Sequence, residues 1–182
     1  MRRLALAAVL ALLPAGTQAA HWKVDAAKSR LGFTVQWSGE AFNAAFKHWS
    51  ADIDFDPAKL GTAKTSVRID LGSEDSGNGE NDDALKGAEG FAVDNFPAAT
   101  FTATRFTAKG NGDYVATGRL DLHGVPKTID LPFHLVITGN TAHVTGKAVV
   151  SRLDFGLGSG NWAGETPIAH SVTITVDLTA VR

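Results

Sequence analysis

The sequence predicts an all-β domain of antiparallel strands, folded as a sandwich or as a closed barrel. Apolar residues occupy every second position in the stretches 31–37, 129–137 and 172–178. A period of two gives each strand one apolar face and one polar face. Turn-forming residues such as Gly139-Asn140 separate most of the stretches. Because little helix is available to cover the apolar faces, the strands must bury them against one another.

The first twenty residues (1–20) predict a secretory signal peptide. The chain opens with two arginines, continues with the apolar run 4–13 and reaches small residues at Ala19 and Ala20. The alternative, a membrane anchor, is disfavoured because the run is shorter than the ~20 residues of a spanning helix. We therefore expect cleavage after Ala19 or Ala20, export to the bacterial periplasm, and one mature domain over residues 21–182.

Period-two patterns mark the candidate strand segments in chain order, and we expect them to build a sheet of about eight strands. The segments are 21–26, 29–38, 41–47, 49–56, 63–72, 99–108, 113–122, 127–138, 141–153 and 169–181.

The first interruption of the pattern is the polar, glycine-rich stretch 73–95. It contains a predicted short helix over 80–88, which Asn78 can cap. Leu85 and Phe91 would turn its apolar side inward, so we interpret the stretch as a lid over one barrel mouth. The alternative is a plain surface connection anchored by these two residues.

The second interruption, residues 156–167, carries several glycines around Trp162. Because glycines weaken a strand, the stretch is either a mobile rim loop or a hairpin with Trp162 packed on the barrel.

Composition and motifs exclude several classes of function. The absence of cysteine rules out iron–sulfur clusters and haem attached through Cys-x-x-Cys-His. Loss of the two N-terminal arginines moves the formal charge from −2 to −4, and without a basic stripe this argues against nucleic-acid binding. The chain has no Gly-x-Ser-x-Gly motif and no phosphate-binding glycine motif, so we predict no catalysis.

The 6 histidines raise the question of a metal site. None forms the His-Glu-x-x-His motif or a helical i, i+4 pair, and we predict no metal site. One alternative stays open at His21. Cleavage after Ala20 would give it a free α-amine that chelates copper together with the imidazole, whereas cleavage after Ala19 would break that arrangement.

The apolar interior allows two readings. A barrel of about eight strands is just wide enough to be filled by its own side chains or to hold one slim ligand. Small residues at inward-compatible positions would leave room along one wall. These residues are Ala103, Ala116, Gly118, Gly146 and Ala148.

Four motifs, taken in order and spacing, carry a resemblance to a known family. They are Asp75-Ser76-Gly77-Asn78 followed by Asp82 and Leu85; Phe96-Pro97-Ala98-Ala99-Thr100-Phe101; Gly118-x-Leu120-x-Leu122-x-Gly124-Val125 with Lys127; and Arg152-x-Asp154-Phe155-Gly156. Over residues 22–181 the chain resembles the YceI-like proteins, which are exported, lipocalin-like and described as polyisoprenoid-binding. It departs from the family pattern at Asn81, where the family has Arg, and at Asp121, where it has Thr.

The resemblance implies an antiparallel lipocalin-like β-barrel with one short helix or lid segment, and a tunnel for an isoprenoid or similar amphiphilic lipid. The ligand would be a ubiquinone-like molecule or a polyprenyl phosphate, the protein a non-enzymatic periplasmic carrier without a cofactor. Glu80, Asp82 and Lys86 are candidates for contact with its head group. We expect the ligand-binding residues to be Phe33, Val35, Trp37, Phe42, Phe46, Ile53, Ile69, Leu85, Phe91, Phe101, Leu120, Leu131, Phe133, Phe155 and Trp162.

An alternative function belongs to a different class. The glycine-rich run with Trp162 is similar to a subgroup associated with membrane b-type cytochromes. The chain would then be a structural or interaction barrel that works with such a cytochrome without a stored ligand. Both readings allow a homodimer.

Overall fold

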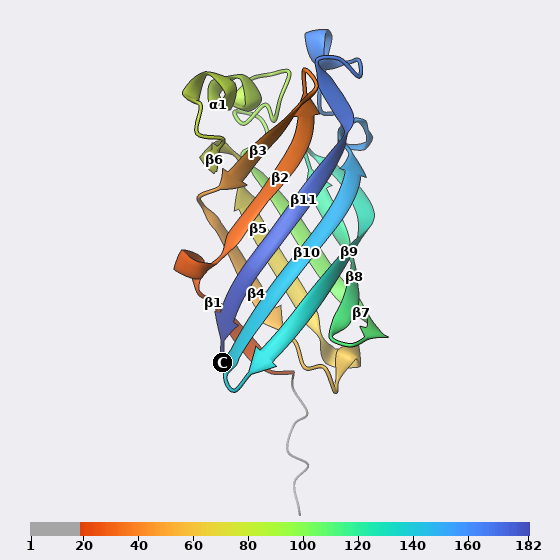
Figure 1. Cartoon of the computed structure of the whole chain (residues 1–182). Helices are drawn as coiled ribbons and strands as arrows, with labels where there is room; N and C mark the ends of the chain where they lie inside the picture. Colours follow the sequence, from red (N-terminus) through yellow and green to blue (C-terminus); the bar gives the residue numbers. More distant parts are fainter. Residues whose placement is uncertain (1–18) are drawn as a thin grey trace, which may run out of the picture.

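The computed structural model describes residues 19–182, which form eleven strand segments and an α-helix. Figure 1 shows long, tilted strands wound around one axis, with the helix at one end and the C-terminus at the other. The elements are β1 (His21–Val24), β2 (Arg30–Trp37), β3 (Glu40–Phe46), β4 (Trp49–Asp54), β5 (Lys64–Asp70), β6 (Glu74–Asp75), α1 (Gly79–Lys86), β7 (Ala98–Gly110), β8 (Asp113–Leu122), β9 (Val125–Thr138), β10 (Thr141–Ser151) and β11 (Ile168–Val181).

The sheet closes on itself through β11. This strand pairs with β10 along one side, and along the other with β2 and then, near its end, with β1. A single-turn 3₁₀ helix at Ala26–Lys28 separates β1 from β2, and Lys47-His48 separate β3 from β4. β1 and β2 follow each other as one long, interrupted strand, and so do β3 and β4. These two long strands lie side by side, because β1 pairs with β4 and β2 with β3. Within residues 19–182 the result is a closed antiparallel barrel of eight long strands, which confirms the predicted fold and sets the sandwich aside.

Local sequence explains the elements well. Each of the predicted strand segments overlaps an observed strand, and the one that was missed is β6, a two-residue strand paired with the end of β3. The predicted helix over 80–88 is observed at Gly79–Lys86. The Asn78 side chain caps it by accepting hydrogen bonds from the backbone N–H groups of Glu80 and Asn81, at 3.1 and 3.2 Å.

The end of the barrel that holds the C-terminus is sealed by Trp22. Its indole is 3% exposed and donates a hydrogen bond to the carbonyl of Phe55 at 2.8 Å. The guanidinium of Arg182 lies over the indole, 5.0 Å from the ring centroid. Phe55 in turn packs edge-on against Phe106 and Tyr114 at 5.3 and 5.4 Å between centroids. These contacts close this end with rings.

Most of the expected signal peptide, residues 1–18, lies outside the described residues. Ala20 is described, and its carbonyl accepts a hydrogen bond from the backbone N–H of Phe55 at 2.8 Å. No helix among residues 19–182 combines the length and the apolar character needed to cross a bilayer.

Candidate functional site

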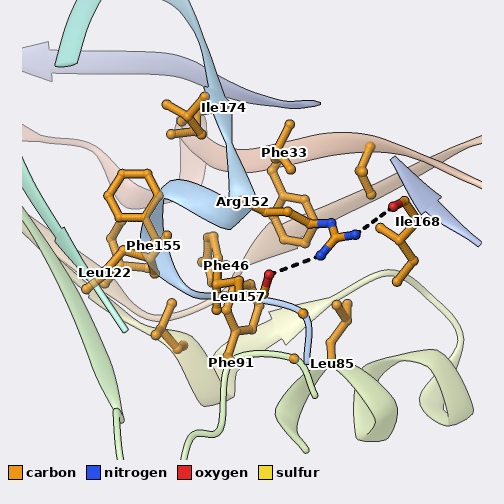
Figure 2. Close-up of a pocket in the computed structure, with 18 of the residues that line it drawn as sticks. Phe33, Phe46, Leu85, Phe91, Leu122, Arg152, Phe155, Leu157, Ile168 and Ile174 are labelled. Atoms are coloured by element: carbon orange, nitrogen blue, oxygen red, sulfur yellow. Dashed lines mark hydrogen bonds between the residues drawn. The ribbon is translucent and has the colours of Figure 1, made fainter. Parts of the chain in front are cut away.

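An apolar cavity of about 120 Å³ lies inside the barrel beneath α1, and we call it the helix-end cavity. Apart from Glu89 and Arg152, its lining consists of apolar residues and glycines. Figure 2 shows how strand side chains and side chains from the two irregular stretches meet around it. Nine of the predicted ligand-binding residues line it: Phe33, Val35, Phe46, Ile69, Leu85, Phe91, Leu120, Phe155 and Trp162.

A second apolar cavity, of about 160 Å³, lies toward the Trp22 seal, and we call it the termini-end cavity. Thr65 is the one residue of its lining that is neither apolar nor aromatic. The predicted residues found here are Ile53, Phe101, Leu131 and Phe133, together with Ile69 and Leu120, which line both cavities. The interior is thus neither filled throughout nor one open tunnel.

Two predicted residues, Trp37 and Phe42, line neither cavity. Trp37 is the last residue of β2, and its ring packs against Phe42 at 5.1 Å and Trp162 at 5.5 Å between centroids. These rings therefore pack beside Trp162, a residue of the helix-end lining, without lining the cavity themselves.

Small residues leave room only at some of the expected positions. Ala116 and Ala148 are buried and line the termini-end cavity. At Gly118 the ring of Phe101 fills the space that a Cβ would take. At Gly146 a Cβ would stand 3.0 Å from the carbonyl oxygen of Pro132 and 3.1 Å from the Cβ of Phe133, so little room is left there.

The stretch 73–95, which we call the lid, lies over the helix end, and its two predicted anchors face inward as both the lid interpretation and the anchored surface connection require. Leu85 and Phe91 are buried and point into the helix-end cavity (Figure 2). Phe91 packs edge-on against Phe33 at 5.9 Å between ring centroids. Burial of side chains of this size contributes roughly 1.5–3 kcal/mol each, enough to hold the segment against the barrel.

Arg152 ties the glycine-rich loop to the barrel from the inside. Its residue is 6% exposed, and its guanidinium donates to the carbonyls of Leu157 (3.0 Å), Gly164 (2.6 Å), Ile168 (2.8 Å) and Ala169 (3.1 Å). Figure 2 shows the two of these bonds that reach Leu157 and Ile168. Burial lowers the pKa of the guanidinium, and the charge of Glu165 opposes that shift. The side chain thus acts as a four-way tie across residues 152–169.

The two irregular stretches meet at the mouth of the helix-end cavity. The backbone N–H of Asn161 donates to Oε1 of Glu89 at 3.2 Å, and the Asn161 amide group lies 3.5 Å from the same oxygen. Gly160 lies against the Glu89 carboxylate so closely that no Cβ would fit. This contact joins lid and rim loop at the protein surface.

The three head-group candidates do not line either cavity. Glu80 is exposed on α1. Asp82 is buried and accepts hydrogen bonds from the backbone N–H and hydroxyl of Ser76 at 2.9 and 2.6 Å. Lys86 lies 3.9 Å from the carboxylate of Glu74, a buried residue under the lid. Burial raises the pKa of Glu74 to about 7, while the charge of Lys86 acts in the opposite direction.

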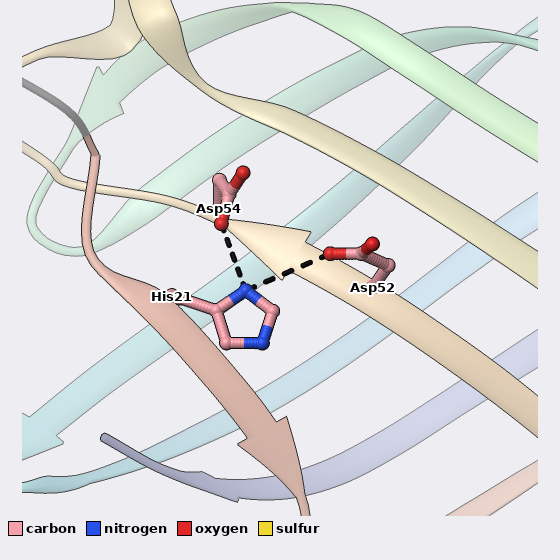
Figure 3. A group of neighbouring side chains, drawn as sticks. All are labelled: His21, Asp52 and Asp54. Atoms are coloured by element: carbon pink, nitrogen blue, oxygen red, sulfur yellow. Dashed lines mark hydrogen bonds and ion pairs between the residues drawn. The ribbon is translucent and has the colours of Figure 1, made fainter.

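A separate group of side chains lies on the outer face near the termini. His21 Nδ1 is 2.9 Å from Oδ1 of Asp54 and 3.6 Å from Oδ1 of Asp52 (Figure 3). Their possible ligand atoms all lie within 4.8 Å of one another. The hydrogen bond from His21, then that from Lys64, lowers the pKa of Asp54, so these neighbours balance its charge. The sequence analysis did not predict that these three residues lie together. Pairing of β1 with β4, which sets His21 opposite Asp54, is the signal that could have indicated it.

The sequence profile of the YceI-like domain matches residues 22–180. The chain belongs to the YceI-like domain family.

Relatives of this YceI-like chain carry names that assign no activity. A UPF0312 protein of Shewanella baltica is 33% identical over 155 residues, covering 80% of this chain and 81% of the relative. A UPF0312 protein of Vibrio parahaemolyticus is 34% identical over 136 residues, covering 73% and 72%.

Solved structures share the barrel. The crystal structure of Burkholderia cenocepacia BcnA superposes with a TM-score of 0.85 at 30% identity, covering 87% of this chain and 100% of BcnA. A polyisoprenoid binding domain from Saccharophagus degradans superposes with a TM-score of 0.67 at 18% identity, covering 88% and 97%. At that identity the second likeness shows the fold alone.

Proposed function

We propose that this YceI-like protein is a non-enzymatic carrier that holds the apolar tail of an isoprenoid lipid inside its barrel. The observation that carries the proposal is the pair of apolar cavities along the barrel axis, sealed at one end by Trp22 and covered at the other by two loops. A related fold is named a polyisoprenoid binding domain, which supports this class of ligand.

The energetics favour an aliphatic chain over a polar ligand. Each buried CH₂ contributes roughly 0.8 kcal/mol, so a few isoprene units offset the several kcal/mol that association costs. A polar ligand would find few partners, because Glu89 and Arg152 supply the charged groups of the helix-end lining and Arg152 already donates to four carbonyls. The same scarcity of titratable groups supports a function without catalysis.

The cavity volumes set a limit on what the described conformation holds. An apolar cavity of ~150 Å³ accommodates a benzene-sized ligand. A long polyprenyl tail therefore requires lining side chains to move aside, or the contact between Glu89 and Asn161 to open so that the tail can protrude.

The place of action is part of the proposal. Export directed by the N-terminal segment, followed by its removal as a signal peptide, would place the barrel in the periplasm. There it would lie next to the membrane where isoprenoid lipids reside. A b-type cytochrome partner and a homodimer stay predictions from the sequence resemblance.

Lipid co-purification tests the function. The full chain is expressed in a bacterial host, purified from the periplasm and extracted with organic solvent for mass spectrometry. We expect an isoprenoid quinone or polyprenyl lipid at up to one equivalent per chain. Delipidated protein should take up added ubiquinone, with quenching of tryptophan fluorescence.

The matched control uses β10. Val150→Phe adds a ring inside the helix-end cavity, whereas Val149→Phe changes a 69% exposed residue on the outside. We expect the first variant to lose the lipid and the second to keep it. Protein that carries no lipid and takes up no quinone would rule the function out.

A further inference from the structure

Four aliphatic side chains line both cavities at once: Leu31, Ile69, Leu120 and Ile174. They come from β2, β5, β8 and β11, strands spread around the barrel order. Leu31 and Leu120 are buried, at 7% and 5% exposure. The four side chains therefore mark the boundary between the two cavities, which we call the waist.

The alternation of inward-facing residues along the strands agrees with this placement. Inward-facing residues on a strand recur at every second position. Along β11, Val172 lines the helix-end cavity, Ile174 the waist and Val176 the termini-end cavity. The same succession occurs along β5 and the residue that follows it, where Val67 lines the termini-end cavity and Leu71, directly after β5, lines the helix-end cavity on either side of Ile69.

We propose that the waist sorts ligands by tail length. This inference rests on the proposed function and deepens it. A short isoprenyl tail occupies the helix-end cavity alone, and a longer tail displaces the waist side chains and reaches the termini-end cavity. The Trp22 seal then ends the path, so further isoprene units gain nothing.

The physical basis is the balance between new burial and displaced packing. Each additional buried CH₂ strengthens binding by roughly fourfold, while the waist must give up its own contacts before the first carbon beyond it gains any. Affinity should therefore rise with tail length up to the waist, pause, rise again past it, and level off when the termini-end cavity is full.

The test uses synthetic ubiquinone analogues with one, two, four and eight isoprene units, titrated into delipidated full-length mature protein. Quenching of tryptophan fluorescence reports binding. Two variants on the same strand separate the cavities. Ala148→Phe adds a ring in the termini-end cavity, and Val150→Phe, two residues further along, adds the same ring in the helix-end cavity.

We expect Ala148→Phe to bind the shortest analogues within about twofold of the parent protein and to lose about tenfold or more for the longest ones. Val150→Phe should weaken binding at every length. Leu120→Ala, which widens the waist, should strengthen the long analogues relative to the short ones. Ala116→Leu provides a smaller plug of the termini-end cavity should the phenylalanine variant fail to fold.

The outcomes keep the two proposals apart. A parent protein whose affinity does not change between one and eight isoprene units overturns the waist while leaving the carrier function standing. Equal losses at all lengths in the Ala148→Phe and Ala116→Leu variants also overturn it. A parent protein that binds no analogue overturns the carrier function, and the waist with it.

Discussion

The ammonium group of Lys86 lies 3.9 Å from Oε1 of Glu74, and within residues 19–182 neither carboxylate oxygen of Glu74 accepts a hydrogen bond. Glu74 belongs to β6 at the barrel edge, and Lys86 ends the helix above it. A buried carboxylate with a single cation and no hydrogen bonds is costly when ionised. The lid therefore rests on a group whose charge depends on pH.

This geometry predicts that Glu74→Gln flattens the pH dependence of stability. Burial raises the Glu74 pKa in the folded protein to about 7 from the ordinary 4.5. Since the folded state holds the proton more tightly, this group's contribution is fully present below pH 4.5 and is lost as the pH rises to about 7. At roughly 1.36 kcal/mol per pKa unit, the loss amounts to at most about 3–4 kcal/mol.

Urea unfolding of parent and variant at pH 5 and at pH 8 measures this effect. We expect the variant to be more stable relative to the parent at pH 8 than at pH 5. The free energy of unfolding of the variant minus that of the parent should therefore be more positive at pH 8. Glu80→Gln, an exposed change on the same helix, should leave the parental pH profile intact. A variant profile that parallels the parent at both pH values contradicts the interpretation.

Arg152→Lys should destabilise the protein although it keeps the charge. A lysine has no planar fork and cannot reach the four carbonyls, spread over residues 157–169, that Arg152 reaches. Unpaired buried carbonyls cost about 1–3 kcal/mol each, so we expect a loss of at least about 2 kcal/mol. Denaturant titration with unchanged slope provides the measurement.

Arg119→Lys is the control for this prediction. Arg119 is exposed and its guanidinium pairs with Asp121 at 3.1 Å on the outer surface. Exposed pairs contribute about 0–1 kcal/mol, so the control should stay close to the parent. Equal stabilities for the two lysine variants would show that the tie across residues 152–169 does not hold the loop.

The sequence predicted the parts of this fold that depend on neighbours along the chain. Alternation marked the strands, and Asn78 with the acidic residues after it marked the helix start. Arg152 was missed as a buried tie because charged residues are mostly exposed, and its partners are carbonyls that carry no sequence signal.

The division of the interior depends on register between strands, which the sequence does not state. Ile69 and Leu120 were predicted as lining residues, but their shared position at the waist follows only from the closed pairing order. Trp37 was expected inside by alternation, yet at the end of β2 its ring packs against Phe42 and Trp162 and lines neither cavity. Alternation along a strand identifies its apolar face, and the pairing order of the closed barrel determines which residues of other strands that face contacts.

Asn78→Ala should loosen the lid without unfolding the barrel. The Asn78 side chain is the acceptor for two backbone N–H groups of the first helical turn, and loss of such a cap costs about 1 kcal/mol. We expect faster hydrogen exchange for amides of α1, with exchange in β7 to β10 unchanged. Asn95→Ala, an exposed change in the same stretch, serves as the control. Unchanged exchange in α1 would show that packing of Leu85 alone fixes the helix.

If residues N-terminal to the barrel are removed as the signal peptide we propose, the contact between Ala20 and Phe55 predicts where the mature chain begins. Cleavage after Ala20 would remove the carbonyl that accepts the Phe55 N–H at 2.8 Å, and Phe55 is buried, so the donor would lose its partner. An orphaned buried donor costs about 1–3 kcal/mol, whereas cleavage after Ala19 keeps the bond. Signal-peptide cleavage also favours small residues three positions and one position before the cut, a requirement that Thr17 with Ala19 meets better than Gln18 with Ala20.

We therefore expect the intact mass of periplasmic protein to correspond to a chain that starts at Ala20. His21 is then the second residue, and the chelate of a terminal α-amine with its own imidazole does not form at that position. Ala19→Gln, which places a large residue directly before the cut, should leave unprocessed precursor in the membrane fraction. A mature mass that starts at His21 would contradict the prediction and restore the copper alternative beside Asp52 and Asp54.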